Sequence, residues 1–180
     1  MKKIMFNDKY LLTQEVLKGR KTQTRRILLP HTVHKLRNGN DYQEVIRLYS
    51  TYKVGEVVAV AQRYKDIALD LPVELAAELI KQPGWTNKMF VKADLMPNRI
   101  RITNIRIERL QDISEEDCLA EGIVDFESRI NKAHFYSITD ESATYGTAKK
   151  PYSLLIDKIS GKGTWKNNPY VFVYDFELID

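Results

Sequence analysis

The segment richest in reactive side chains is residues 19–26, which read Gly-Arg-Lys-Thr-Gln-Thr-Arg-Arg. Four cations and two hydroxyl groups lie within seven of these residues. Crowded cations attract an anion and lower the pKa of a lysine held among them, the more so if that lysine is desolvated. A neutral Lys21 beside the hydroxyl of Thr24 would form a base and nucleophile pair. The same composition also suits a basic turn in solvent, so both interpretations stay open at this point.

The rest of the sequence offers little that could hold a metal or a cofactor. His31, His34 and His134 do not have metal-ligand spacing with carboxylates. Cys118 has no nearby histidine, and we interpret it as a small buried hydrophobe. The phosphate-loop, dinucleotide-binding, zinc-protease and serine-hydrolase motifs are all absent from the sequence. We therefore expect no metal and no cofactor.

Charge is distributed unevenly along the chain. The net charge is +4, but residues 1–40 contain ten Lys or Arg and two acids, a net of +8, so the remaining 140 residues carry −4. Such asymmetry favours a polyanion or a phosphate-bearing partner, and we predict that this segment supplies most of a positive rim around the binding site. A solvated basic face is the alternative.

Length and composition limit the class of protein. The chain has 180 residues, of which 43% are hydrophobic and 29% charged, which fits one globular domain and excludes wholesale disorder. No apolar stretch is long enough for a membrane span, and we expect no secretory signal. One cysteine excludes an intrachain disulfide, and a cytoplasmic location is expected.

The elements that must position these residues follow from periodicity and from caps. Strands are expected at 2–6, 22–29, 57–61, 89–92, 99–110 and 170–178, with a bulge in the fifth at Thr103-Asn104. Helices are expected at 13–18, 72–80, 114–121 and 149–160, with Thr13 and Ser114 as N-caps. In the helix at 72–80, Val73, Ala76, Ala77 and Ile80 form the predicted apolar face. Residues 31–51 and 123–147 look polar and irregular. The pattern favours an α+β fold with a small barrel.

Several blocks of the sequence resemble the ASCH domain, a relative of the PUA RNA-binding fold. Its signature is Gly-x-Lys, then an acidic or hydroxyl residue three positions after the lysine, then x-Arg; Gly19, Lys21, Thr24 and Arg26 stand in that register. Residues 109–117 (RLQDISEED), 120–123 (AEGI), 163–165 (GTW) and 167–173 (NNPYVFV) resemble bacterial and phage-borne members in the family's order. The resemblance covers about half of the chain.

The resemblance implies a single PUA-like domain, a small β-barrel of about five to six strands flanked by short helices. The segments near 64–98 and 123–147 would then be insertions that lie outside the barrel. RNA, a nucleotide or a modified nucleoside would bind in the cleft between the barrel and the helices.

One branch of the family, known as N4-acetylcytidine amidohydrolase, has threonine at the position of Thr24. Its catalytic lysine, threonine and glutamate correspond to Lys21, Thr24 and Glu121. Thr24 would attack or position a water, Lys21 would take the proton, and Glu121 would orient Lys21 or protonate the leaving amine. We expect the three groups to converge on one cleft, with Lys21 in the turn before the strand, partly buried, and its pKa lowered.

Other residues are candidates for binding rather than for catalysis. Arg20, Arg25 and Arg26 could bind the ribose, the phosphate or the oxyanion, while Trp165, Tyr170 and Trp85 could stack on a base, although core packing is the commoner fate of such aromatic residues. The alternative function is a non-catalytic nucleic-acid-binding module, in which the cations contact phosphate and Thr24 is structural. A nuclease fits less well, because the sequence shows no clear metal cluster.

Overall fold

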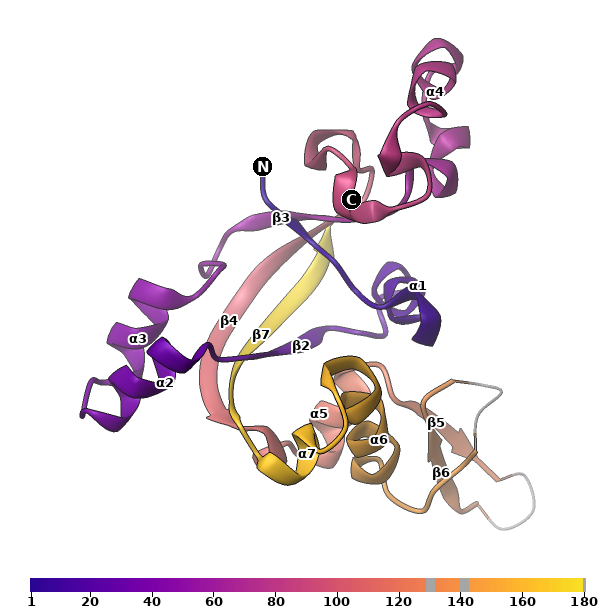
Figure 1. The fold of residues 1–180 in the computed structure, drawn as a ribbon. Helices are drawn as coiled ribbons and strands as arrows, with labels where there is room; N and C mark the ends of the chain where they lie inside the picture. Colours follow the sequence, from indigo (N-terminus) through magenta and orange to yellow (C-terminus); the bar gives the residue numbers. More distant parts are fainter. Residues whose placement is uncertain (129–131, 140–142, 180) are drawn as a thin grey trace.

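The computed structural model describes residues 1–128, 132–139 and 143–179. In this part of the chain it has an α+β fold with two sheets, as expected (Figure 1). The strands are β1 (Lys3–Ile4), β2 (Gln23–Ile27), β3 (Val57–Val60), β4 (Arg99–Arg109), β5 (Val124–Glu127), β6 (His134–Ser137) and β7 (Tyr170–Ile179). The α-helices are α1 (Leu12–Leu17), α2 (Pro30–Arg37), α3 (Tyr42–Tyr49), α4 (Val73–Leu79), α5 (Glu115–Ala120), α6 (Lys149–Ser160) and α7 (Thr164–Asn167). Short 3-10 helices are η1 (Asp8–Tyr10), η2 (Tyr64–Asp66), η3 (Ala68–Asp70), η4 (Pro83–Trp85), η5 (Lys88–Phe90), η6 (Ala93–Leu95) and η7 (Leu110–Asp112).

The main sheet has five strands in the order β1-β3-β4-β7-β2. β1 pairs with β3 in parallel, and the other neighbours are antiparallel. β4 and β7 are the long strands at the centre, whereas β1 and β2 are the two edges and are not paired with each other. The sheet is curved but open (Figure 1), so the barrel closure that we expected is not confirmed.

The bulge expected in the central strand is confirmed. The register between β4 and β7 shifts between Ile102 and Asn104. Ile102 opposes Phe176, and Ile105 opposes Tyr174. Three steps along β4 therefore match two steps along β7, because the bulge adds one residue to β4. All four side chains are buried. The slip in the sequence alternation therefore keeps one face of β4 apolar.

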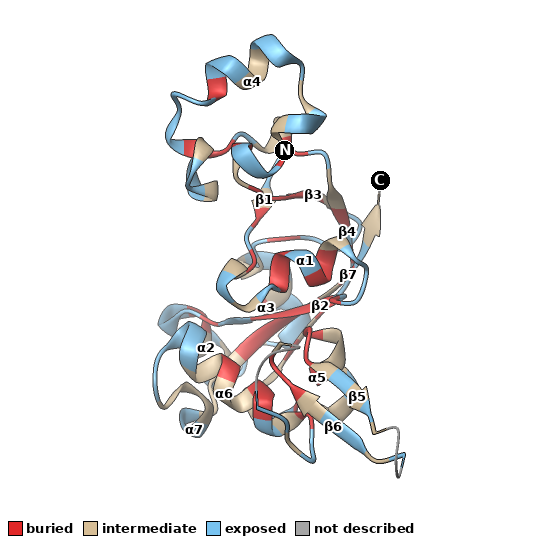
Figure 2. Cartoon of the chain, turned by 90° about the vertical axis from the view of Figure 1, so that its right-hand side faces the viewer, coloured by how far each residue is buried: buried red, intermediate tan, exposed pale blue. Residues whose placement is uncertain are grey.

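Two apolar clusters form the interior. The larger one lies against the main sheet and includes Phe172, Tyr174 and Phe176 of β7. The smaller one joins the end of β3 to the segment 64–98, through Tyr64, Ile67, Leu79, Val91 and Met96 among others. That segment projects from one end of the sheet, and much of its surface is exposed (Figure 2).

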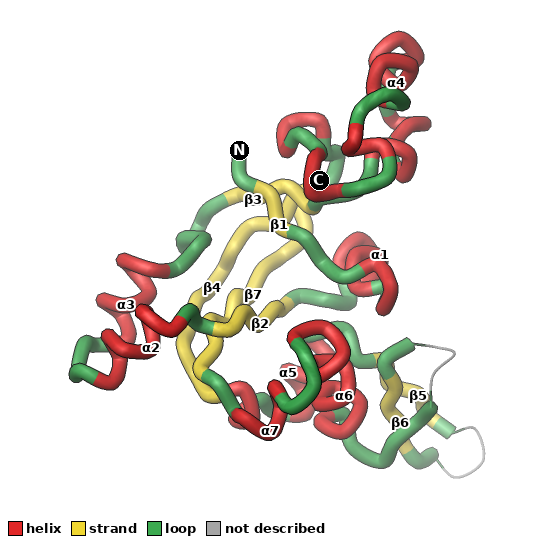
Figure 3. Tube along the Cα trace, in the orientation of Figure 1, coloured by secondary structure: helices red, strands yellow, loops and turns green. Residues whose placement is uncertain are grey.

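Three of the expected elements differ in the structure. Residues 31–51, expected to be irregular, form α2 and α3 (Figure 3). Pro30 starts α2 rather than only ending a strand, because its missing N–H costs nothing at a helix N-terminus. The strand expected at 89–92 was also wrong, because η5 lies there. Part of 123–147 forms the hairpin β5–β6, while 129–131 and 140–142 lie outside the described residues.

Details of two helices also differ from expectation. Leu11, not Thr13, is the N-cap of α1, and the Thr13 hydroxyl donates to Asp8 instead. In α4 the buried residue is Leu79, while Val73 and Ile80 of the predicted apolar face are exposed. In the described residues, neither 64–98 nor 123–147 adds a strand to the main sheet, and their status as insertions stays a prediction. Among the described helices, none has the length and apolar character needed to cross a membrane.

Candidate functional site

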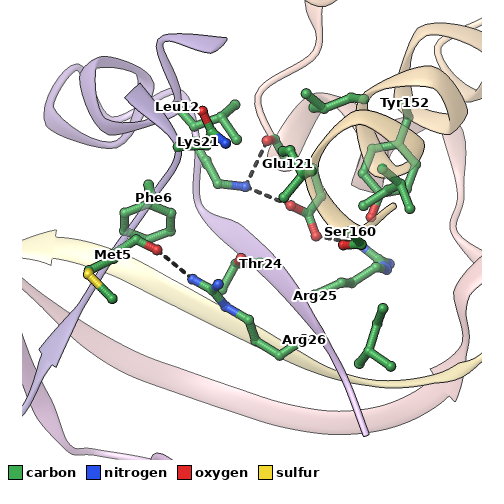
Figure 4. A pocket seen from close by; sticks show the side chains of 15 residues that line it. Met5, Phe6, Leu12, Lys21, Thr24, Arg25, Arg26, Glu121, Tyr152 and Ser160 are labelled. Carbon is green, nitrogen blue, oxygen red and sulfur yellow. Dashed lines mark hydrogen bonds and ion pairs between the residues drawn. The ribbon is translucent and has the colours of Figure 1, made fainter. Parts of the chain in front are cut away.

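A cavity of about 380 Å³ lies where the edge strand β2 meets α6 and the chain after β1 (Figure 4). This volume is within the range of small-molecule sites, roughly 300–1,000 Å³. Its polar lining combines three cations, one carboxylate and hydroxyl groups, and its other lining is largely apolar. The lining residues are Met5, Phe6, Asn7, Leu12, Lys21, Thr24, Arg25, Arg26, Ile27, Glu121, Tyr152, Leu155, Ile156, Ile159 and Ser160.

A tight turn between α1 and β2 places Lys21. Gly19 has φ +70°, a left-handed conformation that ends α1 as expected. The main-chain N–H groups of Arg20 and Lys21 both donate to the carbonyl of Glu15 at 2.9 Å. Lys21 therefore precedes β2, as expected. Side chains alternate between the two faces of a strand, so within β2 Lys21 would point away from Thr24; outside the strand this restriction does not apply.

The Lys21 amine is buried and makes three hydrogen bonds. Its Nζ donates to the carbonyl of Gln23 at 2.7 Å, to the carbonyl of Glu121 at 2.7 Å and to Oε2 of Glu121 at 2.6 Å (Figure 4). Burial lowers the pKa of Lys21, Glu121 partly restores it, and Arg26 and Arg25 lower it further. The expected burial and direction of the shift are both confirmed, with Arg26 and Arg25 as the cations concerned.

Helix α5 and the glycine after it bring Glu121 to Lys21 across 100 positions of sequence. Ser114 caps α5 by accepting from the N–H of Asp117, as expected. Gly122 has φ +100°, and a Cβ there would lie 3.2 Å from Leu12 and 3.6 Å from the Lys21 side chain. Gly122 thus allows the end of α5 to approach the Lys21 turn closely.

Arg25 is buried in a cluster of acids beneath the cavity. Its guanidinium donates to Glu108 at 2.6 and 2.9 Å, to Asp117 at 2.7 Å, to Glu121 at 3.2 Å and also to Gln23. Burial opposes the charge on Arg25, but Glu121 and the other acids outweigh it and raise its pKa. The structure therefore places Arg25, expected to bind substrate, where it orients the second carboxylate oxygen of Glu121.

Thr24 and Arg26 line the same cavity from β2. Thr24 is buried, and its hydroxyl has no hydrogen-bond partner among the described residues. Arg26 is exposed and donates from Nη2 to the carbonyl of Met5 at 2.7 Å (Figure 4). The cavity thus collects Lys21, Thr24 and Glu121 together with two of the three predicted arginines.

The remaining predicted residues lie elsewhere. Arg20 pairs with Glu15 at 2.6 Å and lines a separate cavity. Trp165 packs edge-on against the Tyr152 ring at 6.1 Å. Tyr170 lies under the Arg109 guanidinium, 3.9 Å from ring centre to guanidinium carbon. Trp85 packs on the small cluster of the 64–98 segment. None of the four lines the cavity.

Tyr152 is the residue that the sequence analysis missed. It is 1% exposed and lines the cavity, yet its hydroxyl has no hydrogen-bond partner within the described residues. Burial and Glu121 raise the pKa of Tyr152 well above its ordinary value, so the group stays protonated. Tyr152 lies in the helix expected at 149–160, but nothing in its spacing indicated a neighbouring cavity.

The charge and metal predictions can be compared with this lining. In the lining the cations are Lys21, Arg25 and Arg26, all from residues 1–40; Lys21 and Arg25 are buried and paired with acids, and Arg26 is exposed, so the positive rim stays a prediction. Within the described ranges no group of three His, Cys, Asp or Glu is arranged to hold a metal. Cys118 is buried, and burial raises its pKa to about 12, which agrees with an unreactive thiol.

Comparisons with known proteins do not place the chain. No family model matches it, and searches of curated proteins and of solved structures find no match.

Proposed function

We propose that this chain is an ASCH-domain protein that hydrolyses the amide of N4-acetylcytidine or of a related acylated nucleoside. Its curved sheet would be the counterpart of a PUA-like barrel. The observation that carries the proposal is the ion pair of Lys21 and Glu121, 2.6 Å apart and buried, at a cavity that the Thr24 hydroxyl also lines. A base, a nucleophile and an acid in one partly apolar cavity form the set that amide hydrolysis requires.

In the proposed reaction, Lys21 acts in its neutral form, which burial favours. The Thr24 oxygen bonds to the amide carbonyl carbon while its proton passes to Lys21. The bond between the acetyl carbon and N4 then breaks, and N4 leaves as the amino group of cytidine with the proton returned by Lys21, directly or through Glu121. Water then hydrolyses the acetyl ester left on Thr24, which yields acetate and restores the Thr24 hydroxyl, cytidine having left at the previous step. In the variant of this scheme that stays open, Thr24 positions a water that attacks directly.

Arg26 supplies the electrostatic part of the proposed site. Its guanidinium is at the exposed side of the cavity and uses Nη2 on Met5, which leaves further donors for an anion or a hydroxyl. These donors suit the ribose, a phosphate or the oxyanion that forms on the carbonyl.

The decisive assay measures release of cytidine from a panel of acylated nucleosides by chromatography. Lys21→Arg, Thr24→Ala and Glu121→Gln should each lower kcat/KM by about 100-fold or more, because each removes a group from the proton path. Arginine cannot act as a base near neutral pH. Arg20→Gln is the matched control, since Arg20 is paired with Glu15 outside the cavity. Full turnover by Lys21→Arg, with the fold checked by circular dichroism, would refute the amidohydrolase.

The second candidate is a non-catalytic nucleic-acid-binding module. It is favoured by the origin of all lining cations in the basic segment 1–40. In that case the wild-type protein binds RNA and releases no cytidine from any acylated substrate.

A further inference from the structure

The edge strand β2 turns unpaired main-chain groups toward the cavity. At the two ends of its pairing with β7, the N–H of Leu28 donates to Tyr170 at 2.9 Å and the N–H of Phe176 donates to Thr22 at 2.8 Å. In an antiparallel pair, residues whose N–H and C=O point to the partner alternate with residues whose groups point away. The continuous register therefore directs the main-chain groups of Gln23, Arg25 and Ile27 outward.

This open edge is part of the cavity. Residues 24–27 all line it, and no residue in the described part of the chain hydrogen-bonds to the main chain of Arg25 or Ile27 on this side. The Arg25 side chain is 1% exposed while the whole residue is 8% exposed, so the accessible part of Arg25 is mainly its main chain. The carbonyl of Gln23 is already taken by Lys21. At Arg25 and Ile27, which line the cavity, two N–H donors and two carbonyl acceptors thus remain without a partner among the described residues.

Apolar side chains stand on both sides of this polar edge. Met5 and Phe6 come from the chain after β1, while Ile156 and Ile159 come from α6. In Figure 4, Met5 and Phe6 lie on one side of β2, and Tyr152 and Ser160 of α6 lie on the other. Met5, Ile27 and Ile159 are exposed to about 40%. Exposed apolar groups gathered around one cavity favour a ligand that covers them. A slot with apolar walls and a polar back fits a flat ring inserted edge-on.

We propose that the outward main-chain groups of Arg25 and Ile27 bind the polar edge of a planar, uncharged nucleobase that has an N–H donor next to an acceptor, with its faces between the two apolar walls. The inference rests on the proposed function, which seats an acylated nucleoside in this cavity. It adds that recognition of the base comes from the strand and not from the charged side chains. Lys21, Glu121 and Arg25 are engaged with one another, which agrees with this division.

An added peptide strand is the other ligand that an open edge can bind, and this edge suits it poorly. The stretch with free outward main-chain groups runs only from Arg25 to Ile27. At one end Lys21 donates to the carbonyl of Gln23, and at the other Pro30 begins α2 soon after Ile27. The hydrogen bond from the Arg26 guanidinium to the Met5 carbonyl also links β2 to the chain after β1. A cavity of about 380 Å³ accommodates a ring more readily than an extended chain.

The test removes one main-chain donor and leaves the ladder intact. Ile27→Pro deletes an outward N–H at an edge position, where proline is tolerated. Ile27→Ala is the matched control, because it removes the side-chain contact but keeps the N–H. By isothermal titration with N4-acetylcytidine, Ile27→Pro should bind about five- to tenfold more weakly than Ile27→Ala. If the proline variant does not fold, replacement of the residue-27 amide by an ester makes the same deletion.

A matched ligand tests the same contact from the other side. N4-acetyl-N4-methylcytidine lacks the N–H donor and should bind wild type more weakly than N4-acetylcytidine. Equal binding by Ile27→Ala and by the proline or ester variant would overturn the inference, as would a wild type that binds an extended peptide and no pyrimidine nucleoside. A wild type that binds N4-acetylcytidine with these losses but does not hydrolyse it would refute the amidohydrolase and leave this inference standing.

Discussion

The Lys21 amine is subject to two opposed effects. Three acceptors surround it, and one of them is a carboxylate, which favours the charged ammonium. Burial favours the neutral amine and is the larger effect, so the pKa of Lys21 is lowered overall. A lysine with a lowered pKa loses its proton at a lower pH than a solvated lysine does, and a general base needs this property.

A lowered pKa of Lys21 makes the stability of the protein depend on pH. The unfolded chain holds the lysine proton up to a pKa near 10.5, whereas the folded chain loses it at a lower pH. Between these two values the unfolded state binds more protons, so stability rises with pH by up to about 1.4 kcal/mol per unit. Denaturant unfolding at a series of pH values below 10.5 should show this rise relative to the double variant Lys21→Met, Glu121→Gln. A difference that falls with pH would contradict the buried, destabilised charge.

The unpaired hydroxyl of Tyr152 costs stability in the free protein. Tyr152→Phe should raise the free energy of unfolding by about 1 kcal/mol, because it removes a buried polar group that has no partner among the described residues. The control is Tyr174→Phe, whose hydroxyl contacts Ser50 at 3.0 Å and Thr51 at 3.2 Å and whose loss should lower that energy. Calorimetric melting of both variants measures the contrast. A destabilised Tyr152→Phe would mean that the hydroxyl has a partner in solution.

At the scale of elements, the end of α5 depends on Gly122. Gly122→Ala should destabilise the protein by about 1–2 kcal/mol, since alanine is strained at φ +100° and its Cβ would press on Leu12. Gly146→Ala is the control, because no atom lies within 4 Å of the added Cβ and φ is not in the left-handed region. The two melting temperatures give the comparison. Turnover should also fall in Gly122→Ala, because the displaced helix end carries Glu121.

The long elements could be predicted from the sequence, and the short ones could not. β4 with its bulge, α6 and β7 follow from apolar periodicity over ten or more residues. α2 and α3 were missed because each is only eight residues long and because apolar residues on the exposed face of α3, Tyr42 and Leu48, blur its periodicity. Each buries few side chains, for example Val45 in α3, so the apolar signal is weak.

The site divides in the same way. Lys21, Thr24 and the arginines lie within one short segment and were visible as a cluster. Glu121 was proposed only through the family resemblance, because no local pattern links residues 100 apart. The roles of Tyr152, Phe6 and the β2 edge depend on which strand ends the sheet, and strand order is a tertiary property.

At the scale of the whole molecule, internal ion pairs reduce the positive field of the N-terminal segment. Lys2, Arg20, Lys21 and Arg25 are four of its ten cations, and each is paired with an acid. The exposed cation in the cavity lining is Arg26. RNA that enters this cavity would therefore meet a smaller positive charge than the sequence count suggests.

RNA binding, if it uses this rim, should still depend strongly on salt. Affinity measured by fluorescence anisotropy should fall at least about tenfold between 50 and 200 mM salt, because phosphate contacts release counterions. Arg26→Ala should weaken binding and reduce the slope of log affinity against log salt concentration. Arg101→Ala should change neither, because Arg101 lies near the start of β4, is not in the cavity lining and is paired with Glu177. An affinity that does not change over this range would leave only nucleoside binding for the cavity.

The position of β7 between β4 and β2 has a consequence for synthesis of the protein on the ribosome. Gln23 pairs with Asp175, so β2 has no partner strand until residue 175 has been added. At about 5–20 residues per second, the strand that carries Thr24 waits roughly 8–30 s for its neighbour. During that time β1, β3 and β4 can pair with one another, but β4 lacks β7, its neighbour on the other side. Chaperones therefore have a defined interval in which to bind the nascent chain, and the site can assemble only after that interval ends.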